Sequence, residues 1–259
     1  MRCRRWHDSR EVHPGLISPV FVGRGVELAA LVAALESAAA GEPAVVLVGG
    51  EAGVGKTRLV EEAVDHARQS GTRVLTGSCV ELGGEGLLLS PLVDALRTLM
   101  RVMDPEALDG FLGPARMDLA RLLPELDPQA ATPPAPVGES GSARMLELVF
   151  GVIQRLAAVR PVMLVIEDLQ WADRSTLDLL LLLVRSLRGV RVLIVVTFRS
   201  DEIHRSHPLR TLIAAWERVR SVRRLELPRF TREESAHQLE AILGGPPPRS
   251  SRTSSASSA

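Results

Sequence analysis

The segment VVLVGGEAGVGKTRLVEEA, residues 45–63, contains the residues whose types and spacing point most directly to a chemistry. Within it, 50–57 fits the pattern G-x-x-x-x-G-K-[ST], after a short apolar run and before an amphipathic one. In such a loop the glycines let backbone N–H groups surround a phosphate chain, while the lysine reaches the β- and γ-phosphates. The alternative is an ordinary glycine turn that opens a helix. The residues expected to contact nucleotide are Gly50, Glu51, Ala52, Gly53, Val54, Gly55, Lys56, Thr57 and Arg58.

Lys56 is the only lysine in the chain, and all other members of the 31 Lys and Arg residues are arginines. As a surface cation, arginine serves as well as lysine. Between phosphate oxygens the two differ, because a slim ammonium fits where a planar guanidinium is too broad. The single lysine therefore favours ATP as the ligand of this loop, with the Thr57 hydroxyl taking one position on Mg²⁺.

A second candidate site follows the apolar run VMLVI, where Glu167 and Asp168 end a predicted strand. Parallel strands present their carboxyl ends at the edge of the sheet where nucleotides bind. One carboxylate could hold Mg²⁺ while the other orients or deprotonates the attacking water. The usual order in phosphate-loop proteins is aspartate first and glutamate second, so the reversed order here leaves the two roles open. The alternative is a pair of solvated acids.

Arg199 follows the apolar run VLIVVTF and is the third candidate. An arginine at the end of a strand beside the phosphate loop could contact the γ-phosphate and respond to its hydrolysis. The alternative is a surface arginine. Trp171, close to the acidic pair, is expected to pack in the core.

The composition of the 259 residues narrows the class of protein. Hydrophobic residues make up 46%, the net charge is zero and aromatic residues make up 3%, so a soluble domain without direct nucleic-acid binding is expected. Cys3 and Cys79 lie in no metal-binding spacing. The apolar run 179–184 is too short for a bilayer and 1–10 lacks the apolar core of a secretory signal. A cytoplasmic protein without membrane contact is predicted.

Apolar runs and helical patterns alternate along the chain. This alternation predicts an α/β fold with a mostly parallel sheet that is covered by helices on both faces. Strands are expected at 44–48, 73–79, 162–166, 191–198 and 222–227. Helices are expected at 28–40, 56–70, 143–158, 173–187 with Asp173 as N-cap, 209–219, and after a capping box of Thr231 and Glu234.

The predicted domain covers 20–243. It includes a helical insertion at about 88–128, broken at three prolines, and a Pro-rich loop at 129–141. A disordered leader, 1–19, and a disordered Ser-rich tail, 244–259, are expected on either side.

Taken in order, these segments resemble the ATPase module of large ATP-binding LuxR-family transcriptional regulators, within the STAND class of P-loop ATPases. The resemblance covers about 20–243 through FVGRGVELAAL, GGEAGVGKTRLV, GSCVELGGEGLLLSPLVDAL, ARLLPEL, LVIEDLQWADRSTLDLL, VVTFRSDE and HPLRTL. It implies the fold of a P-loop NTPase, a three-layer sandwich around a mostly parallel five-stranded sheet, and it implies an ATP/ADP switch. It also implies that Val22, Gly23 and Arg24 lie near the adenine and ribose, and that Arg199 is the sensor arginine.

The sequence departs from this family pattern at two places. Gln170 stands where histidine is frequent, which leaves the acidic pair intact. After AILGGPPP no helical lid, helical repeats or helix-turn-helix follows, so a truncated product is expected, with a deliberate single-domain protein as the alternative. The predicted function is a slowly hydrolysing ATP switch of a bacterial transcriptional regulator. One alternative is a non-catalytic fragment that binds nucleotide and interacts with another protein. Another is a DNA-binding regulator, which this chain could be only as part of a longer chain. The expected protein partners are a second copy of this chain or a full-length relative.

Overall fold

The computed structural model describes residues 20–81, 89–127, 139–204 and 207–243. The chain divides into two compact units. The larger is Val26–Pro228, and the smaller joins the chain up to Gly25 with the chain from Arg229 onward. The predicted leader and tail lie outside the described residues, and the limits 20–243 stay a prediction.

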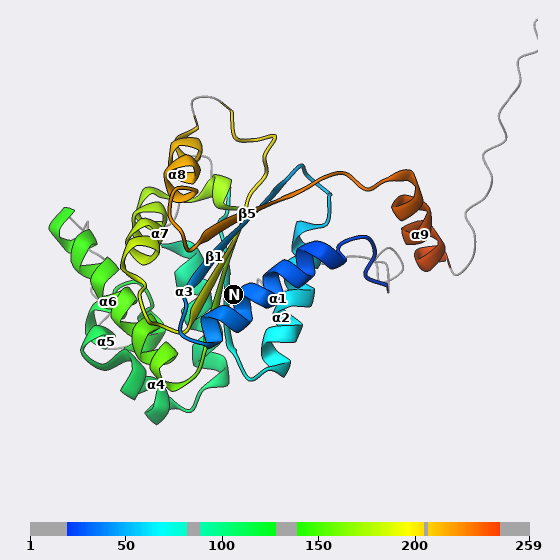
Figure 1. Ribbon diagram of the computed structural model, residues 1–259. Helices are drawn as coiled ribbons and strands as arrows, with labels where there is room; N and C mark the ends of the chain where they lie inside the picture. Colours follow the sequence, from blue (N-terminus) through cyan, green and yellow to red (C-terminus); the bar gives the residue numbers. More distant parts are fainter. Residues whose placement is uncertain (1–19, 82–88, 128–138, 205–206, 244–259) are drawn as a thin grey trace, which may run out of the picture. The chain divides into compact units, whose positions relative to one another are not determined.

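A five-stranded sheet forms the centre of the larger unit, in the order β2-β3-β4-β1-β5 (Figure 1). Its strands are β1 (Ala44–Gly50), β2 (Arg73–Ser78), β3 (Val162–Glu167), β4 (Val192–Thr197) and β5 (Val222–Leu227). All four strand pairs are parallel, and Val46 of β1 lies opposite Val195 on one side and Arg223 on the other. The predicted fold class is confirmed.

Helices cover both faces of the sheet, which explains why its inner strands are continuous apolar runs rather than alternating ones. The helices of the larger unit are α1 (Gly25–Ala39), α2 (Lys56–Gln69), α3 (Ser90–Val102), α4 (Pro105–Leu112), α5 (Arg116–Leu119), α6 (Glu139–Val159), α7 (Arg174–Ser186) and α8 (Pro208–Trp216). Figure 1 shows α1 and α2 on one side of the sheet and α3, α6 and α7 on the other.

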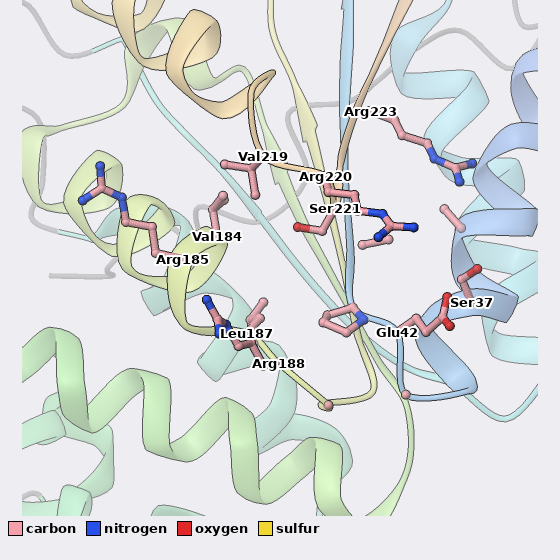
Figure 2. Close-up of a pocket in the computed structure, with 15 residues that line it drawn as sticks. Ser37, Glu42, Val184, Arg185, Leu187, Arg188, Val219, Arg220, Ser221 and Arg223 are labelled. Carbon is pink, nitrogen blue, oxygen red and sulfur yellow. The ribbon is translucent and has the colours of Figure 1, made fainter.

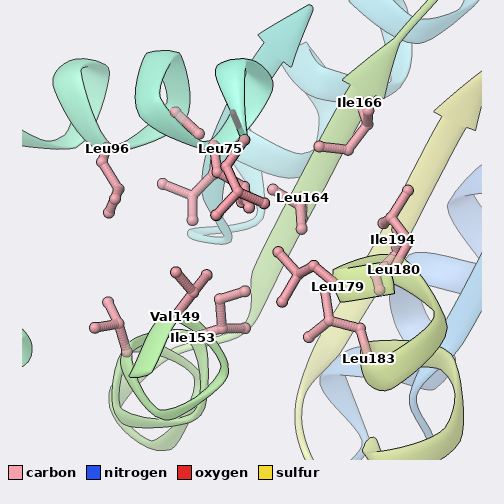
Figure 3. Packing of buried hydrophobic residues seen from close by; sticks show 14 of the residues in the cluster. Leu75, Leu96, Val149, Ile153, Leu164, Ile166, Leu179, Leu180, Leu183 and Ile194 are labelled. Carbon is pink, nitrogen blue, oxygen red and sulfur yellow. The ribbon is translucent and has the colours of Figure 1, made fainter. Parts of the chain in front are cut away.

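The core on the α3, α6 and α7 side is built from leucine, isoleucine and valine (Figure 3). Leu164 of β3 and Ile194 of β4 point from the sheet toward Leu180 of α7, and Ile153 of α6 packs beside them. All four side chains are at most 3% exposed. Because alternate strand residues face opposite sides, their neighbours Met163 and Val195 bury the other face.

Most predicted elements are confirmed to within a few residues, and the capping interactions are present. The Asp173 carboxylate accepts hydrogen bonds from the N–H groups of Ser175 (2.9 Å) and Thr176 (3.2 Å) at the start of α7. In the capping box, Thr231 N–H donates to Glu234 Oε2 (2.7 Å) and Glu234 N–H donates to Thr231 Oγ1 (3.2 Å). These contacts fix where α7 and α9 (Arg232–Leu243) begin.

One predicted loop is partly wrong. Residues 139–141, assigned to the Pro-rich loop, belong to the first turn of α6, while 128–138 lie outside the described residues. A glycine costs a helix only about 1 kcal/mol relative to alanine, which the long apolar face of α6 readily offsets. The insertion is helical as predicted, and Pro105 begins α4.

Within the described part of the chain, no helix is long and apolar enough to cross a membrane.

Gly77 marks the closest approach of β2 to α3. A Cβ at this position would lie 1.7 Å from the carbonyl oxygen of Pro91, which belongs to the backbone and cannot rotate away. We therefore expect Gly77→Ala to lower the free energy of unfolding by about 2–3 kcal/mol, measured by urea denaturation.

Gly110 provides the matched control, because a Cβ there meets nothing within 4 Å and the residue lies inside α4. Gly110→Ala should leave stability unchanged or raise it by up to about 1 kcal/mol. Equal stability of the two variants would contradict the close packing of β2 on α3.

Candidate functional site

The predicted phosphate loop connects the end of β1 to the start of α2, as the sequence pattern requires. Gly53 and Gly55 have φ angles of +76° and +96°, a backbone conformation that other residues rarely adopt. Gly55 is the N-cap of α2, so the loop passes directly into a helix N-terminus, where N–H groups and the helix dipole attract anions. The loop therefore has the backbone form of a phosphate-binding cradle.

Lys56 closes this loop from inside. Its Nζ donates hydrogen bonds to the carbonyl oxygens of Gly50 (2.8 Å) and Glu51 (2.7 Å), and the residue is only 8% exposed. Burial lowers the pKa of the Lys56 ammonium from its ordinary value, and the positive charge of Arg199 lowers it further. The Asp168 carboxylate acts in the opposite direction. A buried cation with only neutral carbonyls as hydrogen-bond partners is well placed to exchange them for phosphate oxygens.

The other predicted loop residues differ in their surroundings. Thr57, on the first turn of α2, is exposed, and its hydroxyl is accessible to a ligand. Arg58 instead forms an ion pair with Glu62 one turn further along the helix (2.7 Å). Val54 is buried and Ala52 is exposed. Contact of these residues with nucleotide stays a prediction.

The acidic pair lies where β3 ends. Glu167 is the last residue of β3, and the hydroxyl of Ser78 on neighbouring β2 donates to its Oε2 (3.4 Å). Asp168 has a φ of +56°, a left-handed conformation that costs most residues about 1–2 kcal/mol. The N–H of Asp168 donates to Thr197 Oγ1 at the end of β4 (3.0 Å), which holds this turn in place.

Gln170 joins the acidic pair to Arg199. Its Nε2 donates to Asp168 Oδ1 (3.2 Å), and its Oε1 accepts a hydrogen bond from the backbone N–H of Arg199 (3.1 Å). Gln170 is 6% exposed, so both ends of a buried amide are satisfied by these two partners. The Gln170 side chain therefore connects the Asp168 carboxylate to the backbone that follows β4.

The Arg199 guanidinium is held by three groups and is not a free surface cation. Its Nη1 donates to Glu202 Oε1 (2.6 Å), its Nε lies 3.8 Å from Asp168 Oδ1, and its Cζ lies 4.8 Å from the centre of the Trp171 ring. The hydrogen bond to Glu202 is the main cause that raises the pKa of Arg199. Trp171 is partly buried and packs against the core as predicted, and it also supports this arginine.

The strand order explains how these groups meet. Because β4 lies between β1 and β3, the residues that follow β4 fall between the phosphate loop and the acidic pair. Charges of Asp168 and Arg199 both act on Lys56, which places the three groups in one electrostatic neighbourhood. Three predicted site residues from distant parts of the sequence are thus brought together.

Val22, Gly23 and Arg24 belong to the smaller unit, separately from the phosphate loop. Arg24 is 3% exposed, and its Cζ lies 4.5 Å from the centre of the Phe230 ring. A Cβ on Gly23 would lie 2.5 Å from Glu234 Oε1 near the start of α9. This segment is therefore packed within its own unit, and its contact with adenine and ribose stays a prediction.

Cys79 lies next to the acidic pair and is buried. Its N–H donates to the Glu167 carbonyl (2.9 Å), and burial raises the pKa of its thiol to about 12, assisted by Asp173 and Asp168. The thiol therefore stays protonated near neutral pH, and it is a packing residue rather than a nucleophile.

The oxygen donors near the loop fit Mg²⁺. They are the exposed hydroxyl of Thr57 and the half-buried carboxylates of Glu167 and Asp168. Among the described residues no group of three or more His, Cys, Asp or Glu could hold a metal by itself. Proteins commonly bind Mg²⁺ through one or two carboxylates together with phosphates of the substrate.

Two residues of this network were missed in the sequence. Thr197 is the only polar residue of β4, and its position at the strand end is a signal that could have identified it. Glu202 carries no such signal, because its role depends on the turn after β4. Gln170 was noted as a departure from the family pattern, without the role that its two hydrogen bonds give it.

Known proteins show similarity to this chain in sequence and in fold. A family model described as an AAA ATPase domain matches residues 20–196. An uncharacterized protein of Rhizobium meliloti (strain 1021) is 28% identical in an alignment of 182 positions, which covers 62% of this chain and 17% of that protein. The chain therefore spans only a small part of this curated relative.

Two solved structures are similar at low identity. The Aeropyrum pernix ORC1 protein in complex with DNA has a TM-score of 0.45 and 19% identity, covering 87% of this chain and 50% of that one. AMPPCP-bound DnaA from Aquifex aeolicus has a TM-score of 0.46 and 15% identity, covering 92% of this chain and 58% of that one. At these scores the likeness carries no inference about ligands or partners.

Proposed function

Because the chain belongs to the AAA ATPase domain family, we propose that it is an ATP-binding switch module that hydrolyses ATP slowly. The observation that carries the proposal is the buried ammonium of Lys56, held by two loop carbonyls at the N-terminus of α2. Phosphate oxygens of ATP would replace the carbonyls as acceptors, and the glycine backbone would surround the β-phosphate.

Asp168 is the acid that we assign to the attacking water. It lies within electrostatic reach of Lys56 and Arg199, the two cations that would face the γ-phosphate. Glu167, which ends β3, is assigned to the metal together with Thr57. When bound, Mg²⁺ would neutralise charge on the β- and γ-phosphates and help to orient them.

We expect slow ATP turnover because Asp168 and Arg199 are both bonded to other side chains of the protein. Asp168 is hydrogen-bonded to Gln170, and Arg199 is paired with Glu202, so neither is directed at a substrate. Both must reorganise before the transition state is stabilised, and catalysis is most effective when no such reorganisation is needed. A switch requires only that the ATP and ADP states favour different conformations.

We further propose that the chain has a role in the regulation of transcription. It is supported by the resemblance of 20–243 to the ATPase module of LuxR-family regulators of the STAND class. In this proposal the chain acts by self-association or by binding a longer relative, and DNA binding belongs to that longer chain.

Replacement of Lys56 tests the nucleotide site. We expect Lys56→Ala to weaken ATP binding at least about a hundredfold, since lost hydrogen bonds to charged groups are worth about 1.5–3 kcal/mol each. Lys56→Arg keeps the charge and should also bind poorly, because the guanidinium is too broad for the loop. Titration with a fluorescent ATP analogue measures both, and unchanged affinity of a folded Lys56→Ala variant contradicts the assignment.

Replacement of the two acids tests their separate roles. Asp168→Asn should retain ATP affinity and lower turnover at least about a hundredfold. Glu167→Gln should lower turnover as well, and in addition it should reduce the dependence of ATP binding on Mg²⁺. Phosphate release and nucleotide affinity are measured for each variant. Normal hydrolysis in both variants would show that the catalytic assignment is wrong. ATP binding without hydrolysis in the unmodified chain would instead favour a non-catalytic interaction fragment.

Gln170 is proposed as a positioning residue, and Gln170→Leu tests this role. Loss of both hydrogen bonds should lower turnover by about tenfold to a hundredfold while ATP affinity changes little, because the Asp168 carboxylate is no longer oriented. Gln170→His, which can donate and accept, should recover part of the turnover. Equal turnover of the Leu variant and the unmodified chain would exclude the role.

A further inference from the structure

A hollow of about 890 Å³ lies at the amino edge of the sheet, at the opposite end of β1 from the phosphate loop (Figure 2). Three segments of the larger unit form it: the end of α1 with the turn to Ala44, the end of α7 with the turn at Gly189, and the chain entering β5. Its volume falls within the range of about 300–1,000 Å³ found for ligand pockets.

The lining of this hollow is strongly basic. It contains Arg185, Arg188, Arg220 and Arg223, all exposed, against one acid, Glu42. Within the part of the chain that the structure describes, none of these arginines makes a side-chain hydrogen bond or ion pair. The excess of positive charge is local, since the net charge of the whole chain is zero.

Arg224, the neighbour of Arg223 on β5, does have partners within the chain. Its guanidinium donates to Glu226 Oε2 (2.8 Å) and Glu217 Oε1 (3.0 Å). Arg223, one residue earlier, lines the hollow without such a partner. Arginines without internal partners that gather around a concavity are suited to bidentate pairing with carboxylates or phosphates of a ligand.

The helix ends at the hollow indicate where in it an anion can bind. α1 and α7 both end here, so their carbonyl groups and the negative ends of their dipoles face the hollow. Carboxylates and phosphates are both disfavoured directly beside these helix ends. Anionic groups are therefore favoured at the arginine side chains, at a distance from the helix ends.

Apolar residues form a second part of the lining, and Val184 and Leu187 among them are buried, so they form a floor. The apolar residues that line it are Ala34, Pro43, Ala44, Val184, Leu187 and Val219. Among the residues that the structure describes, those lining the hollow include no aromatic side chain. An acidic side chain on the rim and an apolar one on this floor match a peptide that carries both.

We propose that this hollow is a docking site for an acidic–apolar peptide segment of a partner protein. Its carboxylates pair with Arg220, Arg223 and Arg188, and its apolar side chains cover the floor. This surface is separate from the nucleotide site and does not depend on ATP hydrolysis.

The test uses a fluorescein-labelled peptide of alternating Glu and Leu residues, with binding measured by fluorescence anisotropy. The unmodified chain should bind it, and the affinity should fall as NaCl rises from about 50 to about 300 mM. The double variant Arg220→Gln/Arg223→Gln should bind about tenfold more weakly. The double variant Arg101→Gln/Arg121→Gln, which removes two exposed arginines elsewhere, should bind as the unmodified chain does.

Other outcomes would overturn the proposal. These are absence of peptide binding, equal loss in the two double variants, or equal binding of a peptide with Gln in place of Glu. Inorganic tripolyphosphate and duplex DNA are tested in a Lys56→Ala background, which removes the phosphate loop. If either binds through Arg220 and Arg223 while the peptide does not, the hollow is a phosphate site and not a peptide site.

Discussion

The site depends on one buried cation. The Lys56 ammonium lies inside the loop that it stabilises, bonded to the carbonyls of Gly50 and Glu51. Burial of an ammonium is unfavourable unless its hydrogen bonds are satisfied, and loop carbonyls satisfy it only partly. The carboxylates of Asp168, Asp201 and Glu226 compensate this charge in part, whereas Arg199 and the positive end of the α2 dipole add to it. A phosphate chain would complete the compensation, which is why the loop favours an anionic ligand.

The parallel sheet then decides which groups share that charge. With β4 between β1 and β3, the turn after β4 lies between the loop and the acidic pair. Thr197 and Gln170 link this turn to Asp168 through a backbone N–H and a carboxylate. The left-handed conformation of Asp168 is maintained by these bonds. If the loss of a γ-phosphate moved Asp168 or Arg199, these hydrogen bonds would therefore move the ends of β3 and β4 together.

The sequence was sufficient for the strands, the glycine loop and the acidic pair, because each depends on local pattern. A short β-branched apolar run such as VMLVI is typical of a strand that is buried on both faces of a sheet. The early start of α6 was not predictable, since its small residues also suit loops. The contact of Glu202 with Arg199 could not be predicted, because it depends on the conformation of the turn after β4. The group of arginines at the hollow could not be predicted either, because a net charge of zero says nothing about where charges lie.

The two ends of β1 carry different chemistry, with Ala44 at the basic hollow and Gly50 at the phosphate loop. Seven residues at about 3.3 Å each separate them by roughly 20 Å. This exceeds the Debye length of about 8 Å at physiological salt, so charges at the two exposed rims influence each other weakly. Any coupling between nucleotide and partner must then be mechanical. β5 is the element suited to it, because it is an edge strand with a single neighbour and so moves more easily than the inner strands.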